Sequence, residues 1–523
     1  MSNMKNPKNA EAIDKNNLKS QLKAEEKVDI ILSSNMQENL EKFKAFLEDS
    51  TDAVFREFYI GINRIPCAIV YIDGLIDKTT VSNQILKSLT YQISILETNT
   101  QRTIDIKNAF DEIKAYAVTI GDIKEADSLD EGVLGVLSGD VAVIIDGSSK
   151  LLIVSARGWP TRGISEPQAE TVIRGSHEGF SETLRFNTAL LRRRCKDPNF
   201  TIKTIQLGRR SKTDVAYAYI KGIVNPGLVE EVERRLNSID IDAILDAGQV
   251  EQLIQDSYIT PFPQVQVTER PDKTIANIVE GRIAILVDNS PYALIVPVSF
   301  YQFLQSPDDY FEKWMFSSIM RVMRWVAYFL TIFTPGIYIA VTSFHPGFIP
   351  TSLAISIAAT RATVPFPVFI EATLMEITFE LLMEAGARLP KPIGSTIGIV
   401  GGIIIGDASV RAGITSPIMV IVVAITAIAS FAIPTYSVSI TLRLLRFPVM
   451  VAAAISGIYG VILSFLTINI HMVTLKSFGM DYMTPRAPIR YEDMKDFLIR
   501  PPIQTEKRRP ISLLPVDMDR QDQ

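Results

Sequence analysis

The chain has 523 residues, of which 47% are hydrophobic and 21% are charged. Its formal net charge of −5 provides no cationic surplus, so we expect no nucleic-acid partner. Two cysteines, Cys67 and Cys195, are too few for a disulfide framework and suit a reducing compartment.

The N-terminal part of the chain is charged and is predicted to lie in the cytoplasm. Residues 1–26 are rich in Asn, Lys and Glu and lack the apolar stretch of a secretory signal, so we expect a disordered lead-in over 1–30. Arg321 and Arg324 stand just before the first long apolar run, which favours a cytoplasmic side for everything that precedes it.

A strand, a turn and a helix are predicted early in the chain. IPCAIVYIDG (65–74) is a β-rich run closed by a turn signal, and a helix is expected to start near Thr79 or Thr80. The segment 139–157 predicts a β-hairpin, because two β-branched runs flank the turn residues Asp-Gly-Ser-Ser. We assign these elements to an α/β subdomain at 31–160.

The same order of elements then recurs. Residues 216–236 parallel the first strand, turn and helix, and 281–297 align with the first hairpin without a gap, Gly281 over Gly139. Chance similarity of such units is the alternative, but the ungapped match favours duplication. We therefore predict a second α/β subdomain at 205–310.

A linker with a basic helix, 161–204, is predicted between the two subdomains. The helix is expected from about Ser181 to Cys195, with Arg192, Arg193 and Arg194 in its last turn. Cations at that end suit the helix dipole and need no ligand. The alternative is a basic patch that binds a partner or lipid headgroups.

Three apolar runs predict a membrane domain at 311–475. The runs 325–344, 416–434 and 447–470 each have about the ~20 residues needed to cross a ~30 Å hydrocarbon core. A soluble core helix is seldom apolar on every face over that length. The Pro- and charge-rich segment 476–523 is predicted to be a cytoplasmic tail.

The number of crossings stays open. Four full crossings with one or two partial segments keep both ends cytoplasmic and fit most of the charges. Arg443 and Arg446 do not fit that scheme if every segment spans.

The segment 364–386 carries an acidic stripe inside an apolar helix. A carboxylate at the bilayer centre costs ~2.5–3.5 kcal/mol, so the stripe must face water, a cavity, the interface or another subunit. One interpretation is an amphipathic helix lying on the membrane. The other is a helix lining a pore, where carboxylates favour cations. The pore-lining candidates on this helix, spaced by four, are Glu376, Glu380 and Glu384.

The next segment, 392–413, has glycine at every fourth position. Small residues at that spacing let helices approach closely in lipid. The helix-packing candidates are Gly394, Gly398, Gly402 and Gly406. Further pore-lining candidates share another face, and these are Thr396, Val400, Ile403 and Asp407.

Several motifs together resemble one known family. They are EPQAETVIRGSHEGFSETLRFNTALLRRR (166–194), TPGIYIA (334–340), VPFPVFIEATLMEITFELLMEAG (364–386), RLPKPIGSTIGIVGG (388–402) and MVIVVAITAIASF (419–431). In the same order over about 60–490, the chain resembles the A-type subunit of the GerA family of spore germination proteins. A homologue from the SpoVA operon shares this architecture, so the paralogue is left open.

The resemblance implies a fold, a location and partners. It implies a multi-pass protein of the spore inner membrane that works with a B-type nutrient-binding membrane subunit and a C-type lipoprotein. Nutrient binding would open a homo-oligomer of A subunits to monovalent cations. The family's cytoplasmic motif falls on Arg174, Gly175, Glu178, Gly179, Phe180, Asn187, Arg192 and Arg194. Ser176 and His177 replace the family's Pro and basic residue, so a role for that turn does not carry over.

Other function classes are disfavoured by the sequence. It has no GxxxxGK[ST], HExxH or GxSxG motif and no Cys/His metal box, so we expect no enzyme, no cofactor and no metal site. A transporter would predict an inverted repeat among the membrane segments, whereas the repeat lies in the soluble half. We predict an α+β protein, a cytoplasmic pair of duplicated α/β subdomains followed by an α-helical polytopic membrane domain. We expect it to be a ligand-gated cation channel subunit; a non-conducting receptor scaffold is the alternative.

Overall fold

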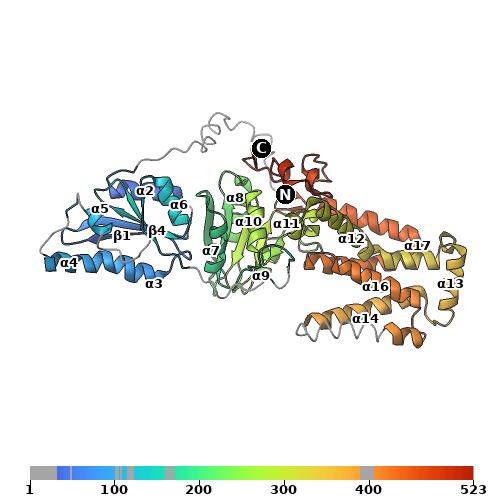
Figure 1. Cartoon of the computed structure of the whole chain (residues 1–523). Coiled ribbons are helices and arrows are strands. Elements are labelled where there is room, and N and C mark those ends of the chain that lie inside the picture. Colours follow the sequence, from blue (N-terminus) through green and yellow to red (C-terminus); the bar gives the residue numbers. More distant parts are fainter. Residues whose placement is uncertain are drawn as a thin grey trace.

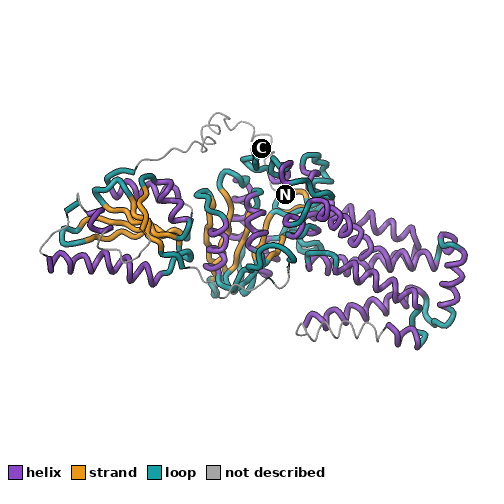
Figure 2. Tube along the Cα trace, viewed as in Figure 1, coloured by secondary structure: helices purple, strands orange, loops and turns teal. Residues whose placement is uncertain are grey.

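The structure is a computed structural model of the chain. It forms two α/β units followed by an elongated bundle of helices (Figure 1), and the two larger sheets lie in the α/β units (Figure 2). The described residues are 32–47, 50–100, 105–106, 109–114, 123–158, 167, 170, 172–388 and 406–521.

The first unit is an antiparallel sheet between two helical layers. Its strand order is β1-β2-β4-β5-β3. The strands are β1 (Ala53–Ile60), β2 (Ile65–Ile72), β3 (Ile123–Ala126), β4 (Asp140–Ile145) and β5 (Leu151–Ser155). One face packs on α2 (Met36–Leu47) and α6 (Leu129–Leu137). The other face packs on the helical segment from α3 (Lys78–Thr80) to α4 (Ile93–Thr100) and on α5 (Ala109–Glu112).

The second unit repeats this strand order, as β6-β7-β9-β10-β8. The strands are β6 (Phe200–Leu207), β7 (Thr213–Ile220), β8 (Gln266–Thr268), β9 (Ile283–Val287) and β10 (Ala293–Val296). Helices α8 (Pro226–Asn237) and α9 (Ala247–Ile254) cover one face, and α7 (Leu184–Arg194) and α10 (Pro271–Val279) cover the other.

Both predicted hairpins are confirmed by the strand pairing. Asp140 pairs with Ser155 in the first unit, and Ile283 pairs with Val296 in the second. The aligned glycines that precede them, Gly139 and Gly281, have φ of 91° and 102°. Only glycine adopts such a conformation without strain, which explains why the repeat keeps it at both sites.

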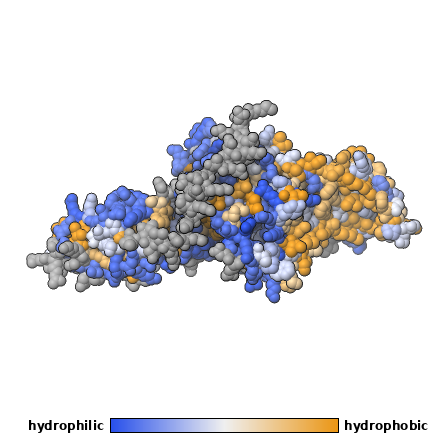
Figure 3. Space-filling view, turned by 90° about the horizontal axis from the view of Figure 1, so that it is seen from above, coloured by the Kyte–Doolittle hydropathy of each residue, from blue (hydrophilic) through white to orange (hydrophobic). Residues whose placement is uncertain are grey.

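The C-terminal part is a helical bundle with an apolar surface. Its helices are α12 (Trp314–Ser343), α13 (Thr351–Arg361), α14 (Val368–Arg388), a short helix at 406–411, α16 (Pro417–Phe431) and α17 (Tyr436–Thr474), preceded by α11 (Asp308–Phe311). Hydrophobic residues dominate this end in the space-filling view (Figure 3). Among the described residues, α12 and α17 are long and apolar enough to cross a membrane, and α16 is a shorter apolar helix.

Helix α17 is folded back on itself. The Thr441 hydroxyl donates to the carbonyl oxygen of Pro261 at 2.6 Å, while His471 Nε2 lies 2.9 Å from the hydroxyl of the adjacent Thr260. In a straight helix those two positions would be ~45 Å apart. The backbone breaks midway, at Gly457, with φ 60° and ψ −140°. Residues 436–456 and 458–474 are therefore two antiparallel helices.

This turn corrects one expectation from the sequence. The run 447–470 is predicted above as a single crossing, which is wrong because Gly457 reverses the chain inside it. Helix α12 contacts both halves of α17: a Cβ on Gly336 would meet Val449 at 2.9 Å, and the rings of Phe333 and Phe465 are 5.8 Å apart. A single glycine does not interrupt the apolar character of the run, so a hydropathy profile alone does not reveal that the chain reverses there.

The tail packs back onto the second α/β unit. It begins with the short strands β11 (Lys476–Ser477) and β12 (Met480–Asp481). In β11, the Ser477 hydroxyl donates to the carbonyl of Gln264 at 2.7 Å. Farther along, the Val516 amide donates to the carbonyl of Ile223 at 2.9 Å. The tail thus connects the base of the bundle to the α/β part.

Candidate functional site

The candidate site is a set of buried charges around α14. This helix begins after Pro365 and Pro367, and its apolar sequence places it among the other bundle helices. Helices α14 and α16 start side by side near Ser416 and both run toward the α/β units, where Met383 and Phe431 line one cavity.

Glu371 anchors the start of α14 to the start of α16. Its Oε1 accepts hydrogen bonds from the Ser416 amide and hydroxyl, both at 2.7 Å, and from the Thr415 hydroxyl at 3.1 Å. Its Oε2 lies 3.4 Å from Arg361 Nε. The N-terminus of a helix attracts acidic side chains, so these contacts hold the starts of α14 and α16 together.

Two arginines of α17 neutralise the next two carboxylates. Arg446 donates to Glu376 and, at 3.0 Å, to Glu380 Oε1. Arg443 Nη1 lies 3.3 Å from Glu380 Oε2. The side chains of Glu376 and Arg446 are 0% exposed, and that of Glu380 is 27% exposed. Removing one partner of a buried pair costs about 3–5 kcal/mol, so the four charges act as a unit that holds α14 against α17.

The remaining membrane candidates are placed differently. Glu384 lies on an exposed turn of α14. Asp407 is also exposed and pairs with Arg411 at 2.7 Å within the short helix at 406–411. A Cβ on Gly406 would lie 3.5 Å from Val420 of α16, an ordinary packing distance. Outside the described residues are Thr396, Val400, Ile403, Gly394, Gly398 and Gly402.

Within the family motif at 174–194, Arg192 joins the two α/β units. Its Nε and Nη2 donate to the two carboxylate oxygens of Asp52, both at 2.9 Å. It also donates to the Ser50 hydroxyl at 2.9 Å and to the carbonyl of Phe200 at 2.6 Å. Arg192 is 0% exposed, so this arginine of α7 is a buried connection to the first unit.

The other two arginines of that turn are paired within the chain. Arg193 donates to Glu178, and Arg194 Nη2 donates to Glu178 Oε2 at 2.6 Å and to the Ser176 hydroxyl at 2.7 Å. These contacts favour internal ion pairs over an open basic patch.

The rest of the motif shapes the loop before α7. Asn187 accepts from the Ser181 amide at 2.8 Å, and the buried Phe180 packs in the core between α7 and the second sheet. Gly179 is buried, whereas Arg174 is exposed.

Gly175 brings this loop against the entry to the bundle. It has φ of +132°, and a Cβ there would lie 2.7 Å from the Phe311 ring of α11. The Ile173 amide donates to Asp308 Oδ1 at 3.2 Å. The motif therefore touches the first unit, the second unit and the segment that leads into α12.

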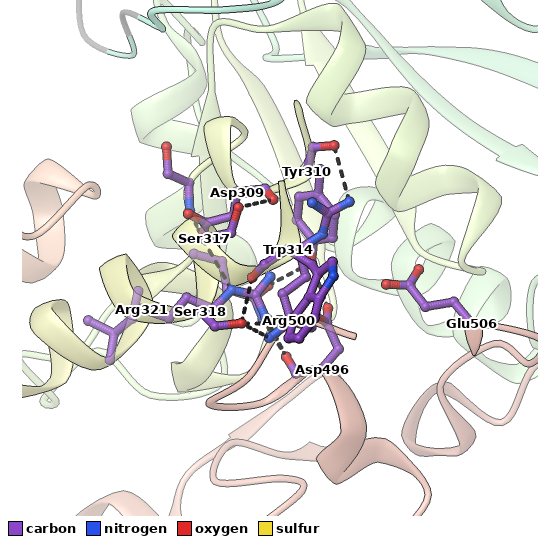
Figure 4. Close-up of polar contacts among 12 residues, drawn as sticks. Asp309, Tyr310, Trp314, Ser317, Ser318, Arg321, Asp496, Arg500 and Glu506 are labelled. Carbon is purple, nitrogen blue, oxygen red and sulfur yellow. Dashed lines mark hydrogen bonds and ion pairs between the residues drawn. The ribbon is translucent and has the colours of Figure 1, made fainter. Parts of the chain in front are cut away.

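A second polar cluster fixes the tail to the base of α12 (Figure 4). Arg321 donates to Asp309 Oδ2 at 3.2 Å and to Asp496 Oδ1 at 2.6 Å. The Tyr310 hydroxyl donates to Asp496 Oδ2 at 2.7 Å, and Arg500 donates to the Tyr310 carbonyl at 3.2 Å. Burial raises the pKa of the Tyr310 phenol well above its usual value, so it stays a donor.

Sequence reasoning missed the partners in these clusters. In the sequence, Arg443 and Arg446 conflict with a scheme in which every apolar segment crosses the membrane. That conflict is the one sequence signal that indicates buried partners for these two arginines. A charge inside an apolar run needs a counter-charge, and acidic residues on another apolar helix are the obvious candidates. Among the described residues, no group of three or more His, Cys, Asp or Glu side chains could hold a metal ion.

Comparison with known proteins places the chain in a family. The family model described as "Bacillus/Clostridium GerA spore germination protein" matches residues 41–512. "Spore germination protein KA" of Bacillus subtilis (strain 168) is 39% identical over 493 residues, covering 94% of this chain and 89% of that protein. "Uncharacterized membrane protein YfkQ" of the same organism is 40% identical over 490 residues, covering 93% of each chain.

A solved structure is also similar. It is the crystal structure of the N-terminal domain of the A subunit of the Bacillus megaterium spore germinant receptor GerK3. It is 37% identical, covers 52% of this chain and 99% of that chain, and has a TM-score of 0.42. The family match spans most of the sequence, and the two relatives match nearly end to end. The chain therefore belongs to the GerA family of spore germination proteins.

Proposed function

We propose that the chain is the A-type membrane subunit of a spore germinant receptor and forms a homo-oligomeric cation channel that nutrient binding opens. It would work with a B-type nutrient-binding subunit and a C-type lipoprotein in the spore inner membrane. Family membership and the apolar helical bundle support this assignment.

The proposed topology is multi-pass with the α/β units and the tail in the cytoplasm. Arg321 and Arg324 at the base of α12 favour the cytoplasmic side, following the positive-inside rule. We divide the chain into an N-terminal lead-in, two duplicated α/β subdomains with a linker between them, a membrane domain and a tail. Their proposed bounds are 1–30, 31–160, 161–204, 205–310, 311–475 and 476–523.

One observation carries the channel proposal: α14 holds Glu376 and Glu380 in ion pairs with the arginines of α17. In the closed state these pairs neutralise both carboxylates. A movement of α14 away from α17 would break the pairs and present carboxylates to a passage for monovalent cations. Glu384 and the candidates from Thr396 to Asp407 remain proposed pore-lining residues.

The second candidate is a non-conducting scaffold in the same complex. It is favoured by the ion pairs of Glu376 and Glu380 with Arg446, because helix packing alone then accounts for both carboxylates. A scaffold would transmit the signal of the nutrient-binding subunit without conducting ions itself.

Potassium release from spores distinguishes the two. We compare wild type with Glu380→Gln and Arg443→Gln at matched protein levels, with Glu57→Gln, an exposed carboxylate of the first unit, as the control. The channel predicts release without germinant, or a changed lag after germinant, in both test variants and not in the control. Normal release in both test variants would reject the channel and leave the scaffold.

A further inference from the structure

We propose that the loop at 256–263 anchors the second α/β unit to the bilayer surface, with the side chains of Tyr258 and Ile259 inserted among the lipid headgroups. The loop joins α9 to β8, outside the bundle and outside the proposed membrane domain at 311–475. The inference rests on the proposed multi-pass topology, which a separate probe tests.

The tip of the loop consists of two adjacent exposed apolar side chains. Tyr258 is 85% exposed and Ile259 is 78% exposed. The structure describes all of 200–300, and no other large hydrophobic side chain in that range is as exposed. Single apolar residues on a surface are common, whereas two neighbours on one bend form an apolar patch that a partner surface would cover.

The loop is held firmly on both sides of this tip. Before the tip, Asp256 accepts a hydrogen bond from the Phe478 amide at 2.8 Å and pairs with Arg235 at 2.7 Å. After the tip, Phe262 is buried, and its ring centroid lies 6.2 Å from that of Phe300. The two apolar side chains are therefore presented by a fixed backbone.

The same loop contacts both halves of α17 at the base of the bundle. The Thr260 hydroxyl lies 2.9 Å from His471 Nε2, and the carbonyl of Pro261 accepts from the Thr441 hydroxyl at 2.6 Å. Thr441 lies five residues after the start of α17 and His471 three residues before its end, about 5–8 Å along the helix axis in each case. The headgroup layer on each side of a bilayer is about 5–7 Å thick, so the loop lies at the depth where headgroups meet the hydrocarbon core.

The apolar surface of the bundle continues up to this loop. Ile440 and Ile470, next in sequence to the two contacted residues of α17, are exposed. Hydrophobic residues also dominate the surface of the bundle in Figure 3. Tyrosine is enriched at membrane interfaces because its ring is apolar and its hydroxyl is polar, and a neighbouring isoleucine adds apolar burial. A lipid surface therefore matches the chemistry and the position of the tip.

The test measures contact between the tip and lipid in the full-length protein. A fluorescent label is attached at Ile259→Cys in a Cys195→Ser background, because Cys67 is buried. The protein is reconstituted at one copy per lipid nanodisc, with phosphatidylcholine that carries a nitroxide quencher on its headgroup, on its acyl chain or not at all.

Two further label positions serve as controls. Leu245→Cys is the matched control, because Leu245 is 69% exposed in the same unit but lies beside the β6–β7 turn, where the Ile244 amide donates to the Ser211 hydroxyl at 3.1 Å. Leu463→Cys, at an exposed position in the second half of α17, tests the membrane topology.

We expect the headgroup nitroxide to cause a loss of fluorescence at position 259 and none at position 245, and the acyl-chain nitroxide to cause a loss at position 463. Quenching at 463 without quenching at 259 would overturn the anchor and leave the topology standing. No quenching at 463 would reject the topology and the anchor with it. Efficient disulfide crosslinking of two copies through Ile259→Cys in membranes would make the tip a protein interface and would also overturn the anchor.

Discussion

Replacing Gly457 with alanine tests the folded-back geometry of α17. The residue has φ of 60° and ψ of −140°, a combination almost restricted to glycine, and strain of that kind costs about 1–3 kcal/mol. The new Cβ would also lie 2.8 Å from His345 Cε1 and 3.0 Å from Phe344 Cβ. Overpacking typically adds about 1–3 kcal/mol, so the total loss is roughly 2–6 kcal/mol.

The assay is thermal unfolding of the full-length protein in detergent. Gly347→Ala is the matched control, because Gly347 lies at the same end of the bundle and a Cβ there would meet nothing within 4 Å. We expect Gly457→Ala to lower the apparent Tm by roughly 5 °C or more and the control to leave it nearly unchanged. Equal Tm values for the two variants would refute the turn and favour a continuous helix.

Three further predictions concern the α/β units. Asp52→Asn leaves the buried charge of Arg192 unbalanced, so it should destabilise the protein by about 3–5 kcal/mol and speed proteolysis between the units; an unchanged cleavage rate would contradict this. Gly175→Ala should lower the apparent Tm through backbone strain of about 1–3 kcal/mol and a clash with Phe311, and a wild-type Tm would show that the loop does not pack there. Burial raises the pKa of Glu251 from 4.5 to about 7. Folding then takes up a proton between those values, so stability should fall as pH rises through that range, and Glu251→Gln should abolish this dependence in a pH series of Tm values.

Much of the local structure follows from the sequence alone. The hairpins follow from β-branched runs on either side of turn residues, and the apolar helices follow from hydropathy, because both signals are local. The family follows from motifs whose order spans most of the chain. These features need no knowledge of which distant segments meet.

The tertiary structure decided which charges meet and where the chain reverses. Glu376 and Arg446 are 70 residues apart, and Asp52 and Arg192 are 140 apart. No periodicity links such positions, because their contact depends on how whole helices and sheets pack. The turn at Gly457 is similar: two antiparallel helices meet there and pack on α12, while the sequence is apolar on both sides of it. The sequence shows that buried charges need partners, and only the packing assigns them.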